Sequence, residues 1–443
     1  MKKSTLTLAV ALGVLAQQAG AAGFIEDSKA TLKLRNFYIN SDNRNANSGA
    51  TQKEWGQGFQ LDYTSGFTQG TVGFGVDAIG LYGVRLDSSR AHHGNANSRA
   101  YGGIVFPTES NGEAVNDFSS LGATAKVKIS QTELRYGTLL PKTPVISYND
   151  GRLLPQTFEG GQIVSNEIKD LTLTAGQIEH VKGRNSSNTE GLSIGGANGG
   201  TTYRNGRFSN QFRYAGADYK LTKDLLVQYW YGGLEDFYKQ HYLGAVHNWA
   251  IGPGVLKSDF RYFHSTDDGK NGDTAAWYTT GYYGGGNTKG KVDNDLYSAL
   301  FLYTVAGHTF GGGYQVSNGD SDFPWLNQGD GSSNYTITDS QIQKFGRAGE
   351  RTWQARYSYD FAKVGVAGLT AGVVYLKGDN IDAAVGDRSE WERDITVAYV
   401  VPEGPLKNFG VMWKNAVWRS DLAATNHAQD ENRVILSYSI PLL

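Results

Sequence analysis

The chain has no cysteine, and only 2 methionines and 9 prolines among its 443 residues. Without cysteine there can be no disulfide framework, no thiol nucleophile and no cysteine-ligated metal centre. Neither sign of charge is in clear excess, because the formal net charge is −2. A nucleic-acid-binding protein depends on a basic surface that neutralises phosphates, so this balance argues against nucleic acid as a partner.

Long apolar runs are also missing beyond the N-terminus. Lys2 and Lys3 precede an apolar run from Leu6 to Ala16, and small residues follow up to Ala21. This run is too short for the ~20 residues of a spanning helix and is typical of a secretory signal peptide. We therefore expect residues 1–21 to be cleaved and residues 22–443 to form a single domain.

What the chain does have is glycine, tyrosine and a period-2 pattern along its whole length, with 58 Gly and 26 Tyr. Val72, Phe74 and Val76 share one face of an extended segment, while Gly73 and Asp77 lie on the other. This alternation is typical of β-strands with one apolar face. About eighteen such segments can be counted, with approximate starts at 30, 54, 70, 118, 131, 161, 170, 208, 223, 237, 253, 293, 307, 351, 368, 391, 407 and 430.

The connections between these segments alternate between short turns and long polar loops. The turns include 65–67 and 222–224, and the long loops include 88–117, 183–207, 267–291 and 319–349. Bacterial outer-membrane barrels have short periplasmic turns, long extracellular loops and strands with one apolar face. The sequence therefore predicts an all-β fold, a transmembrane antiparallel β-barrel of about 18 strands in outer-membrane lipid. Aromatic girdles are expected to include Trp55, Tyr63, Trp230, Trp249, Trp391, Tyr399 and Trp413.

One stretch without strand character, Leu139–Gly160, contains Pro141, Pro144 and Pro155. Proline cannot donate to a strand ladder, so this stretch suits a loop folded into the lumen as a constriction. An external loop is the alternative.

Basic residues occur within the alternating strands, on the face opposite the apolar one. They are Arg35, Lys126, Arg135, Lys414 and Arg433. A lysine or arginine that faces lipid at the midplane costs about 2–4 kcal/mol, so these side chains are expected to face the lumen. Acidic residues such as Asp77 and Glu133 could neutralise these basic side chains. Alternatively, the basic side chains form a series of sites that pass carboxylates along the wall.

Motifs that could support catalysis or metal binding are weak. Gly191–Gly195 matches the nucleophile-elbow pattern around Ser193, but its flanks lack the helical period that the elbow requires. The histidines show no zinc-binding spacing, and His92 and His93 are expected to be solvated in a loop. We see no nucleotide motif and expect no cofactor, no metal and no catalytic residues.

Several long segments resemble the OprD family of outer-membrane porins, also called outer-membrane carboxylate channels. The resemblance covers the whole mature chain and is carried by Gly23–Asn40, Phe67–Ala78, Asn149–Gly161, Leu234–Gly244, Gly349–Ala362 and Asp430–Leu443. The stretches GRLLPQTF, VKGRN, AGADYKLTKDL and SDFPWLNQGDG are most similar to the OccK branch, which includes channels for benzoate-like carboxylates.

The resemblance implies an eighteen-stranded barrel, monomeric or weakly trimeric, with an inward-folded loop that carries Arg152. It places Arg35, Arg152, Lys414 and Arg433 at the family's basic positions. Met412 departs from the pattern, since the branch for basic amino acids has an arginine there. Lys414 also offers a point charge in place of a bidentate guanidinium.

The resulting hypothesis is a substrate-selective channel for the passive uptake of small carboxylates, such as the aromatic monocarboxylate benzoate. The alternatives are a channel for basic amino acids or peptides, a general diffusion porin and, more remotely, an outer-membrane hydrolase that uses Ser193.

Overall fold

The computed structural model describes residues 23–44, 51–93, 103–195, 207–274, 277, 291–326, 333–383, 386–422 and 428–443. The predicted signal peptide, residues 1–21, lies outside the described residues.

The described chain forms one sheet of eighteen strands. The first nine are β1 (Lys29–Asn43), β2 (Gln52–Thr64), β3 (Val72–Asp87), β4 (Asp117–Ile129), β5 (Thr132–Leu139), β6 (Thr157–Ser165), β7 (Leu171–Lys182), β8 (Phe212–Lys220) and β9 (Leu225–Leu234). The others are β10 (Tyr238–Ile251), β11 (Gly254–Asp267), β12 (Asp293–Val305), β13 (His308–Asn318), β14 (Arg351–Asp360), β15 (Leu369–Ile381), β16 (Arg388–Val400), β17 (Gly410–Ser420) and β18 (Ala428–Pro441). Short helical turns are α2 (Arg90–His93), α3 (Lys270–Asp273) and η3 (Phe361–Val364).

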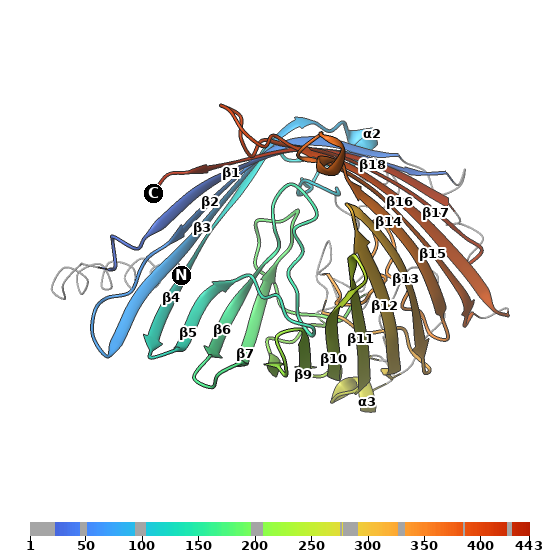
Figure 1. The fold of residues 1–443 in the computed structure, drawn as a ribbon, viewed down its shortest axis with the longest axis horizontal. Coiled ribbons are helices and arrows are strands. Elements are labelled where there is room, and N and C mark those ends of the chain that lie inside the picture. Colours follow the sequence, from blue (N-terminus) through green and yellow to red (C-terminus); the bar gives the residue numbers. More distant parts are fainter. Residues whose placement is uncertain are drawn as a thin grey trace.

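The sheet closes on itself as an antiparallel barrel (Figure 1). Each strand pairs with its neighbour in the sequence, and β1 pairs with β18 from Thr31–Pro441 to Asn43–Gln429. Closure leaves no sheet edge unpaired, which a bilayer requires. The predicted all-β barrel is confirmed, and each predicted strand start lies within four residues of the observed one.

The two ends of the barrel differ in their connections. At one end, called the turn end here, β4–β5, β10–β11 and β12–β13 are joined by two residues each. In the last of these turns, Ala306 and Gly307 both have positive φ, 51° and 86°, as the tight turns of right-twisted hairpins require. The opposite loop end carries the long connections 88–116, 183–211, 268–292 and 319–350, which confirms the predicted alternation.

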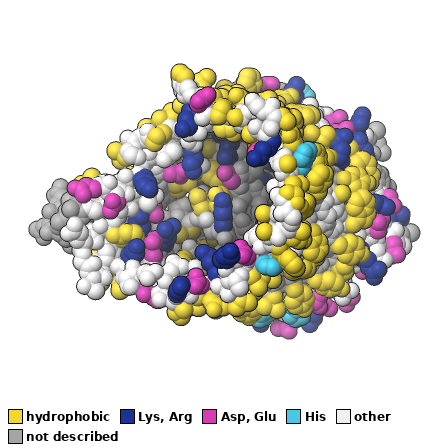
Figure 2. Space-filling view, in the orientation of Figure 1, with side chains coloured by type: hydrophobic (Ala, Val, Ile, Leu, Met, Phe, Trp, Pro, Cys, Tyr) yellow, Lys and Arg dark blue, Asp and Glu magenta, His cyan; other side chains and the backbone are white. Residues whose placement is uncertain are grey.

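The outer surface of the barrel is largely apolar. Leu121, Leu134 and Phe310 are exposed there, and Figure 2 shows hydrophobic atoms over much of the outer wall, with charged side chains inside the opening. Four of the predicted girdle aromatics are exposed: Trp55, Trp249, Tyr399 and Trp413. Trp230 is a wrong prediction, because it lies on the inward face of β9, only 2% exposed, and donates to Asp218. Among the described residues, no helix is long and apolar enough to cross a membrane.

The segment between β5 and β6 reaches across the interior of the barrel. It is shorter than predicted, residues 140–156, because Leu139 ends β5 and Thr157 begins β6. Leu153 packs on Gly56 of β2, while Val145 packs on Gly232 of β9, on a distant part of the wall. Figure 1 shows this stretch, in teal, in the middle of the sheet. Residues 140–156 are called the first inner segment below.

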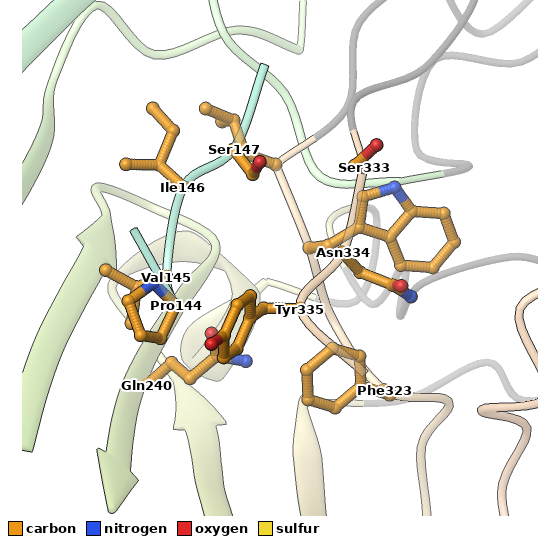
Figure 3. A pocket seen from close by; sticks show the side chains of 11 residues that line it. Pro144, Val145, Ile146, Ser147, Gln240, Phe323, Ser333, Asn334 and Tyr335 are labelled. Carbon is orange, nitrogen blue, oxygen red and sulfur yellow. The ribbon is translucent and has the colours of Figure 1, made fainter. Parts of the chain in front are cut away.

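A second inner segment, residues 333–346, belongs to the long loop between β13 and β14. The sequence predicts this loop to be external, but polar side chains of the barrel wall bind its backbone. Gln315 of β13 donates to the carbonyl oxygen of Phe345, and Arg356 of β14 donates to that of Ile337. The two inner segments meet at the bridge between Ser147 and Ser333. Figure 3 shows Pro144 and Val145 facing Tyr335 there, beside Gln240 of β10.

Candidate functional site

Adjacent strands bring predicted basic residues to one region of the inner wall. Lys414 of β17 is the register partner of Arg433 of β18, and Arg433 in turn lies opposite Ile39 of β1. Because strand residues alternate, Arg35 shares the inward face of β1 with Ile39 and lies four residues nearer the turn end. The first inner segment adds Arg152, whose carbonyl oxygen accepts a hydrogen bond of 2.8 Å from Arg35. Four of the six predicted site residues therefore lie together.

Arg35 holds the tip of the first inner segment. Its Nη1 and Nη2 atoms donate to the two carboxylate oxygens of Asp150, at 2.6 and 3.0 Å. The Arg35 side chain keeps 26% of its surface exposed. This two-pronged geometry is the one in which guanidinium and carboxylate pair most strongly. Arg35 thus combines a structural contact with an accessible positive face.

Arg433 links both inner segments to the wall. Its Nε atom donates to Glu431 at 2.6 Å, Nη2 donates to the carbonyl oxygen of Gln341 at 2.9 Å, and Nη1 reaches that of Gly151 at 3.5 Å. The residue is only 6% exposed. Its charge contributes to the local field, while its donors hold the segments in place.

Lys414 differs from its neighbours. Across the described residues, no carboxylate lies within 4.0 Å of its ammonium group, and no hydrogen bond is formed by it. The side chain is half-buried on the inward face of β17, within electrostatic reach of Arg433, Arg152 and Asp394. A cation held in this way can receive an anion from the lumen without first releasing a partner.

Lys126 and Arg135 are register partners on β4 and β5, away from this cluster. The Lys126 ammonium forms an ion pair with Asp77 at 2.7 Å, donates to the carbonyl oxygen of Ser65 and is only 3% exposed. Arg135 pairs with Glu133 at 2.5 Å. Both lie near the turn end, where they match the expectation of a neutralised wall.

Acidic side chains that sequence reasoning missed hold the second inner segment. Glu392 of β16 is fully buried and accepts from the backbone N–H groups of Ile342 and Gln343, at 2.8 Å each. Asp394 of the same strand accepts from the N–H group of Gln341. The alternation of Glu390, Glu392 and Asp394 on one face could have revealed an inward acidic row, but not its partners.

A buried charged cluster fixes the base of this loop. Arg347 pairs with Glu390 at 3.1 Å, and its backbone N–H group donates to Glu350. Glu350 directly precedes β14, and its burial raises its pKa well above the usual range. The loop is thus anchored by ionisable groups that water does not reach.

Two further predictions concern histidine and serine. His93 is not solvated as predicted: it is fully buried, and its Nδ1 atom lies 2.7 Å from Glu54. Glu54 also accepts from the backbone N–H group of Val105, so this network ties His93 and Val105 to β2. Ser193 is likewise fully buried, so a substrate cannot reach it. Within the described parts of the chain, no group of three His, Asp or Glu residues has an arrangement that could hold a metal ion.

A family comparison gives this geometry a context. Residues 22–442 match the model of the family described as outer membrane porin, OprD family. The chain belongs to the OprD family. The protein is therefore a substrate-specific outer-membrane channel and not an enzyme.

Individual relatives share the fold over almost the whole chain. The crystal structure of Pseudomonas aeruginosa OccK8 (OprE) is 62% identical, with a TM-score of 0.86 over 95% of this chain and 100% of that chain. The structure of Pseudomonas aeruginosa OpdK with vanillate, a small carboxylate, is 35% identical, with a TM-score of 0.82 over the same shares. The porin-like protein GalP of Pseudomonas putida is 35% identical over 99% of this chain and 97% of its own. The resemblance to the OccK branch is confirmed.

Proposed function

We propose that this OprD-family channel takes up small carboxylates by passive diffusion, with aromatic monocarboxylates such as benzoate as preferred solutes. The observation that carries the proposal is Lys414, an inward cation without an ion pair among the described residues, beside Arg433 and Arg152. OpdK, a similar protein, has been crystallised with vanillate. Residues 1–21 are proposed to be a signal peptide that is removed on export.

Lys414 provides the proposed contact for the carboxylate. At 4 Å, an ion pair is worth ~1–4 kcal/mol for effective dielectric constants between 80 and 20. That range concentrates an anion at the site and still permits its release, as conduction requires. The exposed face of Arg35 offers the next positive contact toward the turn end.

Arg152 and Arg433 complete the proposed path by maintaining a positive field over the same stretch of wall. Arg433 achieves this while its donors bind Glu431 and backbone carbonyls. Lys126 and Arg135 are left out of the proposed binding path because each pairs with an acid near the turn end.

The acidic residues do not favour a channel for basic amino acids. Glu392 is buried and accepts two backbone hydrogen bonds, and Glu431 pairs with Arg433. A carboxylate that is already bound to N–H groups has little capacity for a passing ammonium group. These two acids are therefore unavailable to a cationic solute, whereas Asp150 stays partly exposed beside Arg35.

The two inner segments are proposed to narrow the passage at the level of this site. They contact different sides of the wall and meet each other at Ser147 and Ser333. A narrow passage brings a solute within contact distance of Lys414 and excludes water from between the two charges, which strengthens their attraction. A general diffusion porin would lack this binding step.

Planar-bilayer recording tests the proposal. The purified protein is placed under a salt gradient to obtain the reversal potential, and sodium benzoate or vanillate is then added to one side. We expect anion selectivity and interruptions of the current that increase with carboxylate concentration. Cation selectivity, or current that benzoate neither interrupts nor saturates, would contradict the proposed function and favour a general porin.

A further inference from the structure

Aromatic and basic side chains alternate along a row near the loop end of β14, β15, β16 and β17, strands that lie side by side (Figure 1). Trp353 of β14 is the register partner of Lys377 of β15, which is in turn the partner of Trp391 of β16. Trp391 is the partner of Arg419 of β17. Arg351, the first residue of β14, lies next to the row on the loop-end side. These five residues are called the outer basic row below.

The outer basic row faces the lipid. Trp391 lies between Glu390 and Glu392, which are both buried and bind loop residues inside the barrel. Successive strand residues alternate between the two faces, so Trp391 points outward. Register partners in neighbouring strands share a face, so the rest of the row points outward as well. Trp353 accordingly is 42% exposed.

The row also lies at the extracellular interface of the membrane. The Tyr375 ring is 5.3 Å from that of Trp353 and stacks on that of Trp391 at 5.9 Å. Aromatic girdles mark the membrane interfaces of such barrels, and their long loops are extracellular. Because β14 begins directly after the long loop 319–350, this girdle belongs to the extracellular side. Long basic side chains at this level reach the lipid headgroups while their stems remain on apolar surface.

The outward charge in this region is mainly basic. Over the loop-end half of β14 to β18, the described outward residues include four cations and two carboxylates, namely Arg351, Lys377, Arg393 and Arg419 against Asp379 and Asp430. Within the described part of the chain, Arg351 forms neither an ion pair nor a side-chain hydrogen bond. An anion can therefore bind Arg351 without displacing a partner.

The two acids hold their partners only weakly. Lys377 lies 3.2 Å from Asp379, and the two side chains are 41% and 49% exposed. Asp430 is shared between Arg419 at 2.6 Å and Arg44 at 2.9 Å. Exposed ion pairs of this kind contribute little to stability, so a stronger anion can compete for the cations. Phosphate is such an anion, since guanidinium groups bind its oxygens in a two-pronged manner.

We infer that the outer basic row binds the phosphate group of a lipid headgroup in the extracellular leaflet. Lys377 is two residues before Asp379, the register partner of Arg351, so Arg351 and Lys377 are diagonal neighbours. Diagonal positions on adjacent strands lie about 7–8 Å apart, which allows two long side chains to reach one phosphate. Trp353 adjoins both cations and offers its ring to the acyl chains below the headgroup. These aromatic contacts favour a lipid over a free phosphate ion, and the inference does not depend on which solute the lumen carries.

Native mass spectrometry of the purified, delipidated protein tests the inference. The added probe is lipid A, whose sugar headgroup carries phosphates. We expect lipid A to remain bound to the wild-type protein, and Arg351→Gln/Lys377→Gln to weaken this binding about fivefold for each cation removed. The matched control is Arg213→Gln on β8, an exposed residue that follows the fully buried Phe212 and therefore faces outward. Its register partners Gln177 and Gly233 are uncharged, so this variant should bind lipid A as the wild-type protein does.

Removal of the phosphates from lipid A should weaken its binding to the wild-type protein as much as the double substitution does. Equal binding of lipid A by the wild-type protein and the double variant, or an equal loss in Arg213→Gln, would overturn the inference. Complete displacement of lipid A by inorganic phosphate would assign the row to a free ion, and association of lipid-free protein that the double variant abolishes would assign it to a protein contact. Heat-modified mobility and an unchanged single-channel conductance show that each variant folds.

Discussion

Arg35 and Asp150 face each other across the gap between the wall and the first inner segment, joined by hydrogen bonds of 2.6 and 3.0 Å. The pair lies 115 residues apart in the sequence and fixes the segment beside the basic cluster. The same arginine therefore positions the loop and presents charge to a solute. Its acidic partner lowers the net positive charge that an incoming carboxylate meets.

Replacing Asp150 with Asn is expected to increase anion selectivity. The change removes one negative charge beside Arg35 and keeps an acceptor of similar shape, so that the segment stays in place. The pair is partly exposed, and its loss should cost only about 1 kcal/mol of stability. The reversal potential under a salt gradient measures the effect, and Arg35→Gln is expected to shift it in the opposite direction. Identical reversal potentials in both variants would show that the pair does not control selectivity.

Replacing Lys414 with Gln is expected to shorten the residence time of a carboxylate at the site. Without a competing ion pair in the described structure, the ammonium group is available for the solute, and its removal should lower the residence time about tenfold, equivalent to about 1.4 kcal/mol. Single-channel current interruptions by benzoate measure this time. Lys128→Gln, near the turn end, serves as the control and should leave the interruptions unchanged.

Gly58 is expected to be intolerant of a side chain because the first inner segment approaches it closely. A Cβ atom at Gly58 would lie 2.9 Å from the backbone oxygen of Leu153, which cannot rotate away. We expect Gly58→Ala to displace the segment, at a cost of about 1–3 kcal/mol, and to change the single-channel conductance. At Gly312 a Cβ atom meets nothing within 4 Å, so Gly312→Ala is the matched control. Unchanged conductance in both would mean that the segment does not define the passage.

The base of the loop between β13 and β14, residues 347–350, is expected to loosen as the pH rises. Burial raises the pKa of Glu350, so the folded loop binds a proton that the exposed carboxyl would release. The stabilisation is present at a pH below the ordinary glutamate pKa and is lost as the pH rises through the raised value. Current noise recorded from acidic to alkaline pH should therefore increase, and Glu350→Gln should remove this dependence. Equal pH dependence in both proteins would assign the titration to another group.

The sequence predicted the barrel well because one physical constraint acts on every strand. An outward residue meets lipid and an inward residue meets the lumen, so alternation alone locates the strands to within a few residues. The type of a residue is a poorer guide to its direction than its place in this alternation. Trp230 lies on the inward face of β9 although an aromatic girdle seemed to suit it. Arg393 of β16 faces outward although its charge suggests the lumen, because it lies between the inward Glu392 and Asp394.

The site could be predicted only in part. Alternation indicates that Arg35, Lys414 and Arg433 face inward, and family resemblance adds Arg152. Neither shows that Arg35 pairs with Asp150, or that Glu392 and Asp394 hold a loop that looks external in the sequence. These contacts join residues from distant strands and loops, and no local pattern encodes them.

The sequence by itself therefore determined the all-β class, the number of strands and the two faces of each strand. Only the tertiary structure decided which inward charges are neutralised and which remain available. Closure of the barrel places Lys414 beside Arg433 and Arg35 on adjacent strands of the wall, and the inner segments then bind Arg35 and Arg433 but not Lys414. A period of two residues fixes the direction of a side chain, whereas its partners depend on the register and on loops that cross the lumen.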